Sequence, residues 1–330
     1  ACSNFYKKSP KNIIAVTGTN GKTSIIQIID HIFKKSNISC GLLGTLGFQT
    51  PSGLSSTGFT TPESIELQQM LKTLVIAGVE NIAMEISSHA LSLNRVDDVD
   101  IDIAVFSNIT SEHLDFHKNM ESYFQSKLKL FSELEKSNIA IINIDDPFSD
   151  RIINKTLANV ITYGMGKNAD LYPINVKYEL NGIKALLKFE SIKIKVNSNL
   201  IGSYNLSNIM AAVAVCLKMK ISPESISSAL VDPLFIPGRL ENIPVNIPGK
   251  IFIDYAHTPD AYEKLFTSLT SLKDEEENII TLFGCGGDRD VDKRSKLAEI
   301  SETYALYSFV TLDNPRTESP DKINKDIIQG

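Results

Sequence analysis

The chain lacks a surplus of positive charge. Its 33 Lys and Arg residues are outnumbered by 39 Asp and Glu residues, which gives a formal net charge of −6. A general nucleic-acid binder usually carries a basic surplus, so we expect no nucleic-acid partner. An anionic nucleotide remains possible, because backbone amides at a helix N-terminus can bind phosphate in an acidic protein.

The chain also lacks cysteine pairs and long apolar segments. Its four cysteines are scattered and form no CxxC pair, so reduced thiols are expected rather than a disulfide framework. No apolar run approaches the roughly 20 residues that cross a bilayer, and the first residues do not resemble a signal peptide. We therefore expect a cytoplasmic protein without membrane insertion. Because the sequence starts at Ala1 and stops inside a helical pattern at Gly330, we also expect a piece of a longer protein.

Apolar, β-branched segments alternate with segments of helical periodicity in the first two thirds of the chain. This alternation favours an α/β fold with a mostly parallel sheet. Residues 169–200 are instead rich in strand formers around an Asn181-Gly182 turn signal, which predicts an antiparallel appendage. The predicted strands are 12–17, 81–86, 103–106 and 138–144, and the predicted helices are 24–35, 122–134 and 205–218.

A chain of 330 residues exceeds the usual size of one hydrophobic core, so two domains are expected. Pro237-Gly238 interrupts regular structure and predicts a hinge. A second alternating series follows, which predicts a Rossmann-like α/β domain. We predict domains at 1–237 and 238–330. The second series comprises strands 250–254, 279–283 and 308–312 and helices 260–272, 293–304 and 320–328.

A glycine-rich turn lies between the first strand and the first helix, with the sequence TGTNGKT over residues 17–23. Gly18 and Gly21 allow a tight turn that brings amide groups close to phosphate oxygens. Lys22 would supply a cation to the β- and γ-phosphates, and the Thr23 hydroxyl would ligate Mg²⁺. The general P-loop has a further glycine where this chain has Val16, so the turn is a variant phosphate-binding loop.

This loop resembles that of the Mur ligase family and its folylpolyglutamate synthetase relatives. Further segments resemble the MurE branch of the family in the same order along the chain. Phe59 and Glu112 stand where relatives place Asn and Asp. The matching segments are TTPE at 60–63, EISSHAL at 85–91 with Arg95, NITSEHLDFH at 108–117, GSYNLSN at 202–208, GRLE at 238–241, DYAHTPD at 254–260, FGCGGDRD at 283–290 and DNPR at 313–316.

The resemblance implies a central ATP-binding domain and an incomplete C-terminal amino-acid-binding domain. The family's first domain, which binds the uridine nucleotide, would be absent apart from a tail at 5–10. ATP and Mg²⁺ would be required, and Lys127 would be N6-carboxylated by CO₂ and would ligate the metal. We choose Lys127 over the neighbouring Lys129 from the alignment of QSKLKL at 125–130. The implied metal ligands are Thr23, Glu85, His113 and carboxylated Lys127, and the implied catalytic residues are Lys22, Glu85, His113 and Lys127.

The family pattern also assigns the substrate contacts. A guanidinium binds a carboxylate through two parallel hydrogen bonds, which suits the distal carboxylate of meso-diaminopimelate. The ATP contacts are Gly18, Thr19, Asn20, Gly21, Lys22, Thr23, Ser24, Asn208, Arg239 and Asp254. The muramoyl-peptide contacts are Thr60, Thr61, Ser87 and Arg95, and the diaminopimelate contacts are Arg289, Asp313, Asn314, Pro315 and Arg316.

The implied reaction is ATP-dependent, ADP-forming addition of meso-diaminopimelate to the D-glutamate carboxylate of UDP-MurNAc-L-Ala-D-Glu, through an acyl phosphate. The enzyme would act as a monomer in peptidoglycan precursor synthesis. Three alternatives stay open: a lysine-adding ligase of the same branch, a folylpolyglutamate-type ligase, and a nucleotide-binding module without catalysis. The DNPR segment at 313–316 is what separates the diaminopimelate and lysine alternatives.

Overall fold

The structure is a computed structural model that describes residues 9–329. The chain forms two compact units, divided near Pro237. Most of the predicted tail at 5–10 lies outside the described residues. Within those residues, no helix combines the length and the apolar character that crossing a membrane requires.

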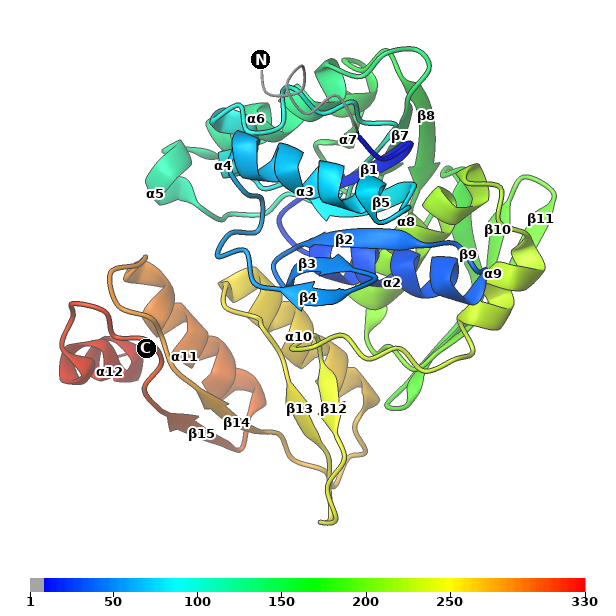
Figure 1. The fold of residues 1–330 in the computed structure, drawn as a ribbon. Helices are drawn as coiled ribbons and strands as arrows, with labels where there is room; N and C mark the ends of the chain where they lie inside the picture. The colour runs from blue at the N-terminus through cyan, green and yellow to red at the C-terminus, as the bar shows by residue number, and fades with distance from the viewer. Residues whose placement is uncertain (1–8, 330) are drawn as a thin grey trace. The chain divides into compact units, whose positions relative to one another are not determined.

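Unit 1 is built on one sheet in the order β11-β10-β9-β8-β7-β6-β1-β5-β2-β3-β4 (Figure 1). The strands from β9 to β2 run parallel, and antiparallel pairs extend the sheet at both ends. The strands are β1 (Asn12–Thr17), β2 (Cys40–Gly44), β3 (Gly47–Thr50), β4 (Gly53–Ser55), β5 (Asn81–Glu85), β6 (Ile103–Phe106), β7 (Ile139–Asn143), β8 (Asn159–Tyr163), β9 (Leu171–Glu179), β10 (Gly182–Phe189) and β11 (Ile192–Ser198).

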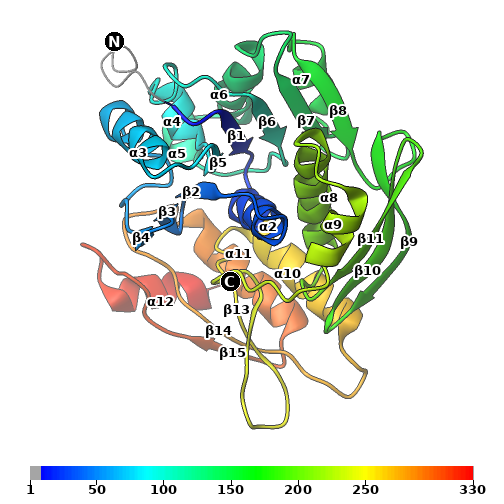
Figure 2. The same ribbon diagram turned by 45° about the vertical axis from the view of Figure 1, so that its right-hand side comes forward.

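Helices cover both faces of this sheet, because its central strands are apolar throughout. One face packs against helices α3, α4, α6 and α7 in a single buried cluster. Helices α2, α8 and α9 lie on the opposite face (Figure 2). The helices are α2 (Lys22–Lys35), α3 (Ser64–Ile76), α4 (Ser88–Ser92), α5 (Leu114–His117), α6 (Met120–Ser132), α7 (Ser149–Ile153), α8 (Ser203–Lys218) and α9 (Pro223–Ala229).

The parallel arrangement places the carboxyl ends of several strands at one edge of the sheet. The glycine-rich loop follows β1, Glu85 ends β5, and Ser107 follows β6. Strand β1 lies between β5 and β6, so the residues that follow these three strands are neighbours in space. Ligands collect at such an edge in open α/β sheets.

Unit 2 contains two separate two-stranded sheets. Strands β12 (Glu241–Ile243) and β13 (Ile251–Ile253) pair antiparallel, whereas β14 (Ile280–Phe283) and β15 (Tyr307–Val310) pair parallel. Helices α10 (Pro259–Leu272), α11 (Asp292–Tyr304) and α12 (Pro320–Ile328) pack together around a small core of six buried residues.

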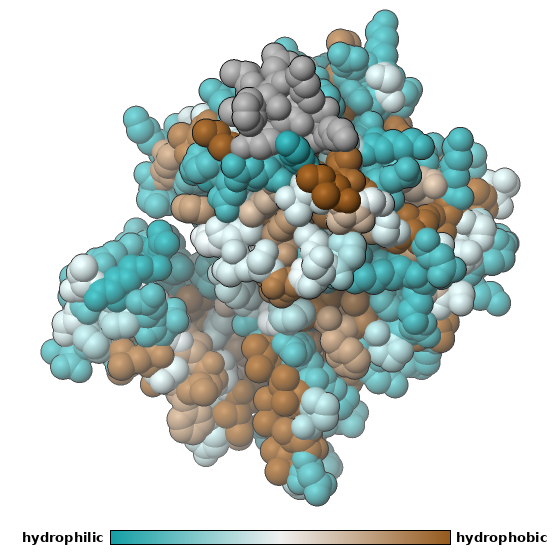
Figure 3. Space-filling model, viewed as in Figure 1, coloured by the Kyte–Doolittle hydropathy of each residue, from teal (hydrophilic) through white to brown (hydrophobic). Residues whose placement is uncertain are grey.

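One face of the β14–β15 pair is not covered by these helices. Ile280 and Leu282 on β14 lie beside Tyr307 and Phe309 on β15, and all four are more than half exposed. Hydrophobic residues gather over the strands of unit 2 in the space-filling view (Figure 3). Parallel strands are normally buried on both faces, so this surface is unusually apolar for one that faces solvent.

The structure confirms the predicted α/β fold with an antiparallel appendage, and it corrects several element boundaries. Helix α2 begins at Lys22 rather than Ser24, because Gly21 adopts φ 88° and ends the turn. Helix α6 begins at Met120 rather than Ser122, because the Asn119 side chain accepts a hydrogen bond from Ser122 N and caps the helix. In unit 2, the predicted strand at 250–254 belongs to an antiparallel hairpin rather than to the parallel pair.

Candidate functional site

The glycine-rich loop folds as a tight turn before α2. Gly18 has φ 145° and Gly21 has φ 88°, which is the region that glycine enters without steric cost. A Cβ atom on Gly18 would lie 1.9 Å from Ser107 Oγ. The Lys22 amine donates to the carbonyl oxygens of Gly18 at 2.9 Å and Thr19 at 2.6 Å. The lysine therefore lies over the loop, and Thr23 and Ser24 are buried in the first turn of the helix.

The segment after β6 holds the loop from one side. Asn20 N donates to Asn108 Oδ1 at 3.0 Å, and the Asn108 amide donates back to Asn20 O at 3.1 Å. Ser107 Oγ also donates to Asn20 O at 2.6 Å. These reciprocal hydrogen bonds fix the middle of the loop to the neighbouring strand, which leaves its backbone geometry well determined.

Lys127 reaches the same loop from α6. Its side chain is 1% exposed, and its amine donates to Gly18 O at 2.9 Å. Burial, and secondarily the nearby Lys22 charge, holds the pKa of Lys127 well below its usual value. Lys129 instead donates to Asn94 and Asp97 at a more exposed position. Of the two lysines considered from the sequence, Lys127 is the one that contacts the loop.

Three histidines lie beside Lys127. His89 contacts the rings of His113 and His117, with centroids at 4.8 and 5.6 Å. Burial is the main cause that lowers the pKa of each, and for His117 the pKa falls to about 4. His117 Nε2 lies 2.9 Å from Ser88 Oγ. This group is therefore uncharged near neutral pH, which keeps additional positive charge away from Lys127 and Lys22.

Tyr123 connects this histidine group to the loop. Its hydroxyl lies 3.1 Å from Thr19 Oγ1, and the Lys127 amine lies 4.7 Å from the centre of its ring. Tyr123 is not among the residues predicted from the sequence. Its position one helical turn before Lys127 is the signal that could have found it, since residues four apart share a helix face.

Glu85 is buried at the end of β5 and accepts several hydrogen bonds. Thr23 Oγ1 donates to Oε1 at 2.9 Å, and Thr45 N donates to the same oxygen at 2.9 Å. Thr45 Oγ1 donates to Oε2 at 3.2 Å. A Cβ on Gly44 would lie 2.2 Å from Glu85 Oε1. Thr45 was missed by the sequence analysis, because strand β2 before it was not predicted.

The residues predicted to contact the muramoyl peptide lie next to Glu85. Thr61 Oγ1 donates to Glu85 O at 2.9 Å and accepts from Ser87 N at 3.1 Å. Arg95 donates to Thr61 O at 3.2 Å and forms an ion pair with Glu63. Thr60 Oγ1 lies 3.2 Å from Thr45 Oγ1.

The two positions that depart from the family pattern lie beside site residues. The guanidinium of Arg95 stands 5.4 Å from the ring centre of Phe59. Glu112 Oε2 lies 3.8 Å from His113 Nε2, so this carboxylate is adjacent to a predicted metal ligand. Both departures are therefore placed where they could affect substrate or metal contacts.

The donor set at Glu85 fits a magnesium ion. A carboxylate and a hydroxyl are the hard oxygen donors that Mg²⁺ prefers, and Glu85 and Thr23 are in direct contact. Over residues 9–329, no three His, Cys, Asp or Glu side chains gather closely enough to hold a metal ion. Of the four predicted metal ligands, only Glu85 and His113 are residues of these four types. A site built from the predicted ligands would therefore not contain three of them.

The remaining predicted ATP contacts are divided between the units. In unit 1, Asn208 is buried on α8, and its Oδ1 would lie 2.3 Å from a Cβ on Gly21. In unit 2, the Asp254 carboxylate accepts Leu240 N at 2.6 Å and Ala256 N at 2.8 Å, while burial raises its pKa. The Arg239 guanidinium stands 4.9 Å from the ring centre of Tyr255.

The predicted diaminopimelate contacts lie on two adjoining segments of unit 2. Gly287 N donates to Asn314 O at 2.9 Å, and the Arg316 guanidinium donates to Gly287 O. Asn314 Oδ1 accepts from Arg316 N at 3.2 Å. Arg289 is exposed two residues after Gly287. The structure thus brings the GGDRD and DNPR segments together.

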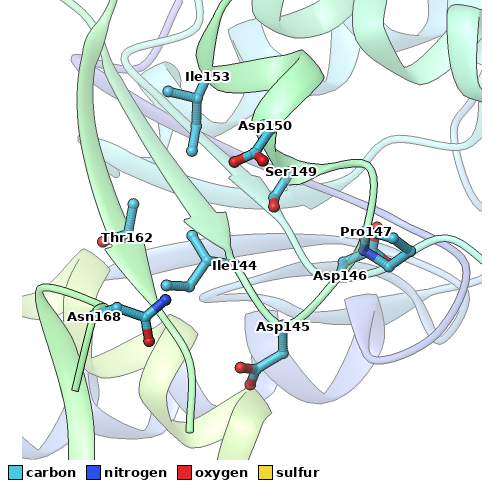
Figure 4. A pocket seen from close by; sticks show the side chains of 9 residues that line it. All are labelled: Ile144, Asp145, Asp146, Pro147, Ser149, Asp150, Ile153, Thr162 and Asn168. Atoms are coloured by element: carbon cyan, nitrogen blue, oxygen red, sulfur yellow. The ribbon is translucent and has the colours of Figure 1, made fainter. Parts of the chain in front are cut away.

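A polar pocket lies at the ends of β7 and β8 (Figure 4). None of the predicted site residues line it. Three aspartates are among its walls, and such a cluster would repel phosphate groups. Asp146 accepts hydrogen bonds from Ile109 N and Phe148 N, so it has a structural role. The lining residues are Ile144, Asp145, Asp146, Pro147, Ser149, Asp150, Ile153, Thr162 and Asn168.

Two domain families match this chain. Residues 16–216 match the Mur ligase middle domain, and residues 238–330 match the Mur ligase glutamate ligase domain. The chain is 40% identical over 324 residues to UDP-N-acetylmuramoyl-L-alanyl-D-glutamate–2,6-diaminopimelate ligase of Geobacter sulfurreducens. That alignment covers 96% of this chain and 63% of the relative. The ligase of the same name from Clostridium botulinum is 39% identical, with 99% and 68% covered.

Solved structures of known proteins are also similar to this chain. A structure of UDP-N-acetylmuramoyl-L-alanyl-D-glutamate–2,6-diaminopimelate ligase superimposes with a TM-score of 0.75 at 32% identity, covering 99% of this chain and 67% of that one. Folylpolyglutamate synthase of Mycobacterium tuberculosis, solved with ADP, has a TM-score of 0.80 at 17% identity, covering 100% and 81%. The latter similarity shows the fold alone. The chain thus spans about two thirds of the length of the curated relatives that it matches, and it belongs to the Mur ligase family.

Proposed function

We propose that the protein containing this chain is an ATP-dependent ligase that adds meso-diaminopimelate to UDP-MurNAc-L-Ala-D-Glu. The observation that carries the proposal is the buried Lys127 amine, which contacts Gly18 of the phosphate-binding loop at 2.9 Å. The names of the relatives in Geobacter and Clostridium supply the substrate class. The solved relatives with bound ADP support the use of ATP.

The proposed reaction has two steps. A carboxylate is a poor electrophile, so the D-glutamyl carboxylate oxygen first attacks the γ-phosphorus of ATP, and ADP leaves. The diaminopimelate amine then attacks the acyl carbon of this acyl phosphate; inorganic phosphate leaves and the amine loses a proton. Phosphoryl transfer is accelerated chiefly by positioning and by cations. Lys22 and the loop amides would hold the phosphates, and Arg239 would supply a further cation.

Magnesium would be held by Thr23 and Glu85, with His113 and carboxylated Lys127 completing the proposed set. When bound, it would neutralise phosphate charge. Thr45 holds Glu85 through two hydrogen bonds, which fixes the direction of its carboxylate. Asn208, Asn20 and the loop amides would orient the nucleotide.

The surroundings of Lys127 support its proposed carboxylation. Only an uncharged amine attacks CO₂, forming a carbamate and releasing a proton. Burial, and then the Lys22 charge, lower the pKa of Lys127, which favours the uncharged amine that this reaction requires. The product carries negative charge beside Lys22, which would stabilise it.

Thr60, Thr61, Ser87 and Arg95 would bind the muramoyl peptide beside Glu85. Arg289, Asp313, Asn314, Pro315 and Arg316 would bind diaminopimelate, with a guanidinium on its distal carboxylate. A lysine side chain lacks that carboxylate and would leave an arginine unpaired, which disfavours it. We also propose a cytoplasmic monomer, because all predicted ATP, peptide and amino-acid contacts lie on one chain.

The experiment is an amino-acid scan with the full-length protein. It uses ATP, Mg²⁺ and UDP-MurNAc-L-Ala-D-Glu and measures both ADP and the ligated product. Product with meso-diaminopimelate only, together with one ADP per amide, is expected. Product with lysine only supports the lysine-adding alternative, and a folate-dependent glutamate product supports the folylpolyglutamate type. Binding of ATP without any product would indicate a nucleotide-binding module.

A further inference from the structure

Arg294 on α11 is the most completely buried charged side chain of unit 2, at 0% exposed. Its guanidinium donates to both carboxylate oxygens of Glu318, at 3.0 and 2.8 Å, and to Asp326 at 2.7 Å. It also donates to Gly286 O at 3.3 Å. Burying a cation is costly unless it is paired and hydrogen bonded. The arginine is therefore held in place by two acidic residues and one backbone carbonyl.

Glu318 joins this arginine to the GGDRD segment. Its Oε1 accepts a hydrogen bond from Asp288 N at 2.6 Å. The Asp288 carboxylate in turn accepts from Thr317 N at 3.0 Å and from Thr317 Oγ1 at 2.8 Å. Each segment thus supplies a carboxylate to the backbone of the other, so the two segments are connected in both directions.

The backbones of these segments approach so closely that only glycine fits between them. A Cβ on Gly287 would lie 1.9 Å from Pro315 O, and one on Gly284 would lie 2.3 Å from Thr311 O. Asp288 and Arg316 both adopt left-handed backbone angles, with φ of 52° and 50°. Such angles cost energy in residues other than glycine and persist where the surroundings impose them.

Each predicted carboxylate-binding arginine is close in sequence to one end of this network. Arg289 directly follows Asp288, and Arg316 directly precedes Thr317. We infer that Arg294 and Glu318 are positioning residues that hold Arg289 and Arg316 at a fixed separation, so that the two guanidinium groups form one site for the amino-acid substrate. This inference rests on the proposed function, because that function makes the amino acid the ligand of these segments.

Asp326 offers a matched control for Glu318. Both carboxylates pair with Arg294, but it is the Glu318 carboxylate that also accepts a hydrogen bond from Asp288 N. Glu318→Gln weakens the ion pair and the link to Asp288. Asp326→Asn weakens only the ion pair. Thr317→Val, at an exposed position, removes the hydroxyl donor to Asp288 without touching Arg294.

The test measures KM for the amino acid, KM for ATP, kcat and the melting temperature in the full-length ligase. We expect Glu318→Gln to raise the KM for meso-diaminopimelate roughly tenfold, because the neutral amide holds both Arg294 and Asp288 N less tightly than the carboxylate. The KM for ATP should stay within about twofold in the same variant. Thr317→Val should raise the amino-acid KM in the same direction, and Asp326→Asn should leave it unchanged.

Two results would overturn the inference. One is an equal rise of the amino-acid KM in Glu318→Gln and Asp326→Asn, which would assign the effect to the ion pair. The other is an unchanged amino-acid KM in a folded Glu318→Gln variant. If Glu318→Gln does not fold, Thr317→Val decides alone, and an unchanged KM in that variant overturns the inference. If the unsubstituted enzyme uses lysine, the proposed function fails, and the same comparison is made with lysine as substrate.

Discussion

Lys127 combines complete burial with a contact to the phosphate-binding loop. An amphipathic-helix lysine normally keeps its amine in water, so burial of the amine itself calls for a chemical reason. A lowered pKa supplies one, because it favours the uncharged, nucleophilic form of the amine. If Lys127 is carboxylated as proposed, this one side chain gives the site an additional negative charge.

Replacing Lys127 by Arg should abolish most of the activity. An arginine cannot form the carbamate, and its permanent charge would lie near Lys22. We expect kcat to fall roughly 100-fold or more, as when one transition-state stabiliser is removed. Lys129→Arg serves as the control and should keep its activity, because Lys129 contacts Asn94 and Asp97 instead of the loop. Intact-protein mass measured under CO₂ should show one added CO₂ in the unsubstituted protein only; a carboxylated or fully active Lys127→Arg protein would contradict the prediction.

Thr45 is expected to control the affinity for magnesium. Thr45→Val keeps the backbone donor to Glu85 Oε1 but loses the hydroxyl donor to Oε2. Loss of such a supporting hydrogen bond typically weakens metal affinity by about 10-fold. Activity titrated with Mg²⁺ should therefore show a higher half-saturating concentration. Thr45→Ser retains the hydroxyl and should behave like the unsubstituted protein, and equal Mg²⁺ dependence in the Val variant would exclude this role.

At the scale of the elements, turns and strand ends bring the candidate site together, and helix α6 adds Lys127 to it. The loop after β1, the end of β5 and the segment after β6 meet because β1 lies between β5 and β6. In unit 2, two turns that follow β14 and β15 are brought together by the parallel pairing of those strands. Their close approach depends on glycine, and their connection depends on ionised carboxylates.

Gly287→Ala should destabilise unit 2 by much more than the usual cost of replacing a glycine at a position with a positive φ. The added Cβ would lie 1.9 Å from Pro315 O, and a clash with backbone cannot be relieved by a rotamer change. We expect a loss of about 2–4 kcal/mol in the free energy of unfolding, measured by urea denaturation. Gly249→Ala is the comparison, since it has φ 106° and no atom within 4 Å. It should cost only about 1 kcal/mol, and similar losses in both variants would refute the clash.

The Arg294–Glu318 pair predicts a pH dependence of stability. Hydrogen bonds from Arg294, and then from Asp288 N, lower the pKa of Glu318 to about 2. A lowered folded-state pKa contributes stability that is present above the unfolded value near 4.3 and is lost as the pH falls toward 2. Urea unfolding between about pH 7 and pH 3 should therefore show a smaller decrease for Glu318→Gln than for the unsubstituted protein. Equal decreases would show that the pair adds no pH-dependent stability.

At the scale of the whole 330-residue polypeptide, an exposed apolar surface is the main feature expected to affect association in solution. Ile280, Leu282, Tyr307 and Phe309 form one face of the β14–β15 pair and are each more than half exposed. Contiguous apolar patches of this kind promote association or mark an interface. The same residues therefore determine the solution behaviour of the polypeptide without belonging to the proposed active site.

At concentrations well above those at which the proposed monomer acts, the polypeptide should self-associate through this face. Leu282→Lys combined with Phe309→Lys places two charges on adjacent strands and should reduce association in sedimentation velocity runs. Ile76→Lys is the control, because Ile76 is 74% exposed at the end of α3 in unit 1, outside this face. A polypeptide that is monomeric without substitution, or that is affected equally by both changes, would contradict the prediction.

The sequence by itself determined the local features of this protein. The strand at 12–17, the loop after it and the order of strands and helices could be predicted, because apolar runs, helical periodicity and glycine act over a few residues. Strand β2, and with it Thr45, could not, since its CGLLG segment is short and has no period. The specific choice of Lys127 came from the family resemblance rather than from helical spacing.

Only the tertiary structure decided which distant side chains meet. Lys127 contacts Gly18 across 109 positions, Thr45 contacts Glu85 across 40, and Arg294 contacts Glu318 across 24. Strand order and register set these contacts, and both depend on how whole elements pack. The sequence pattern of one segment does not predict which distant segments will pack against it. Burial and strand pairing are properties of the assembled sheet.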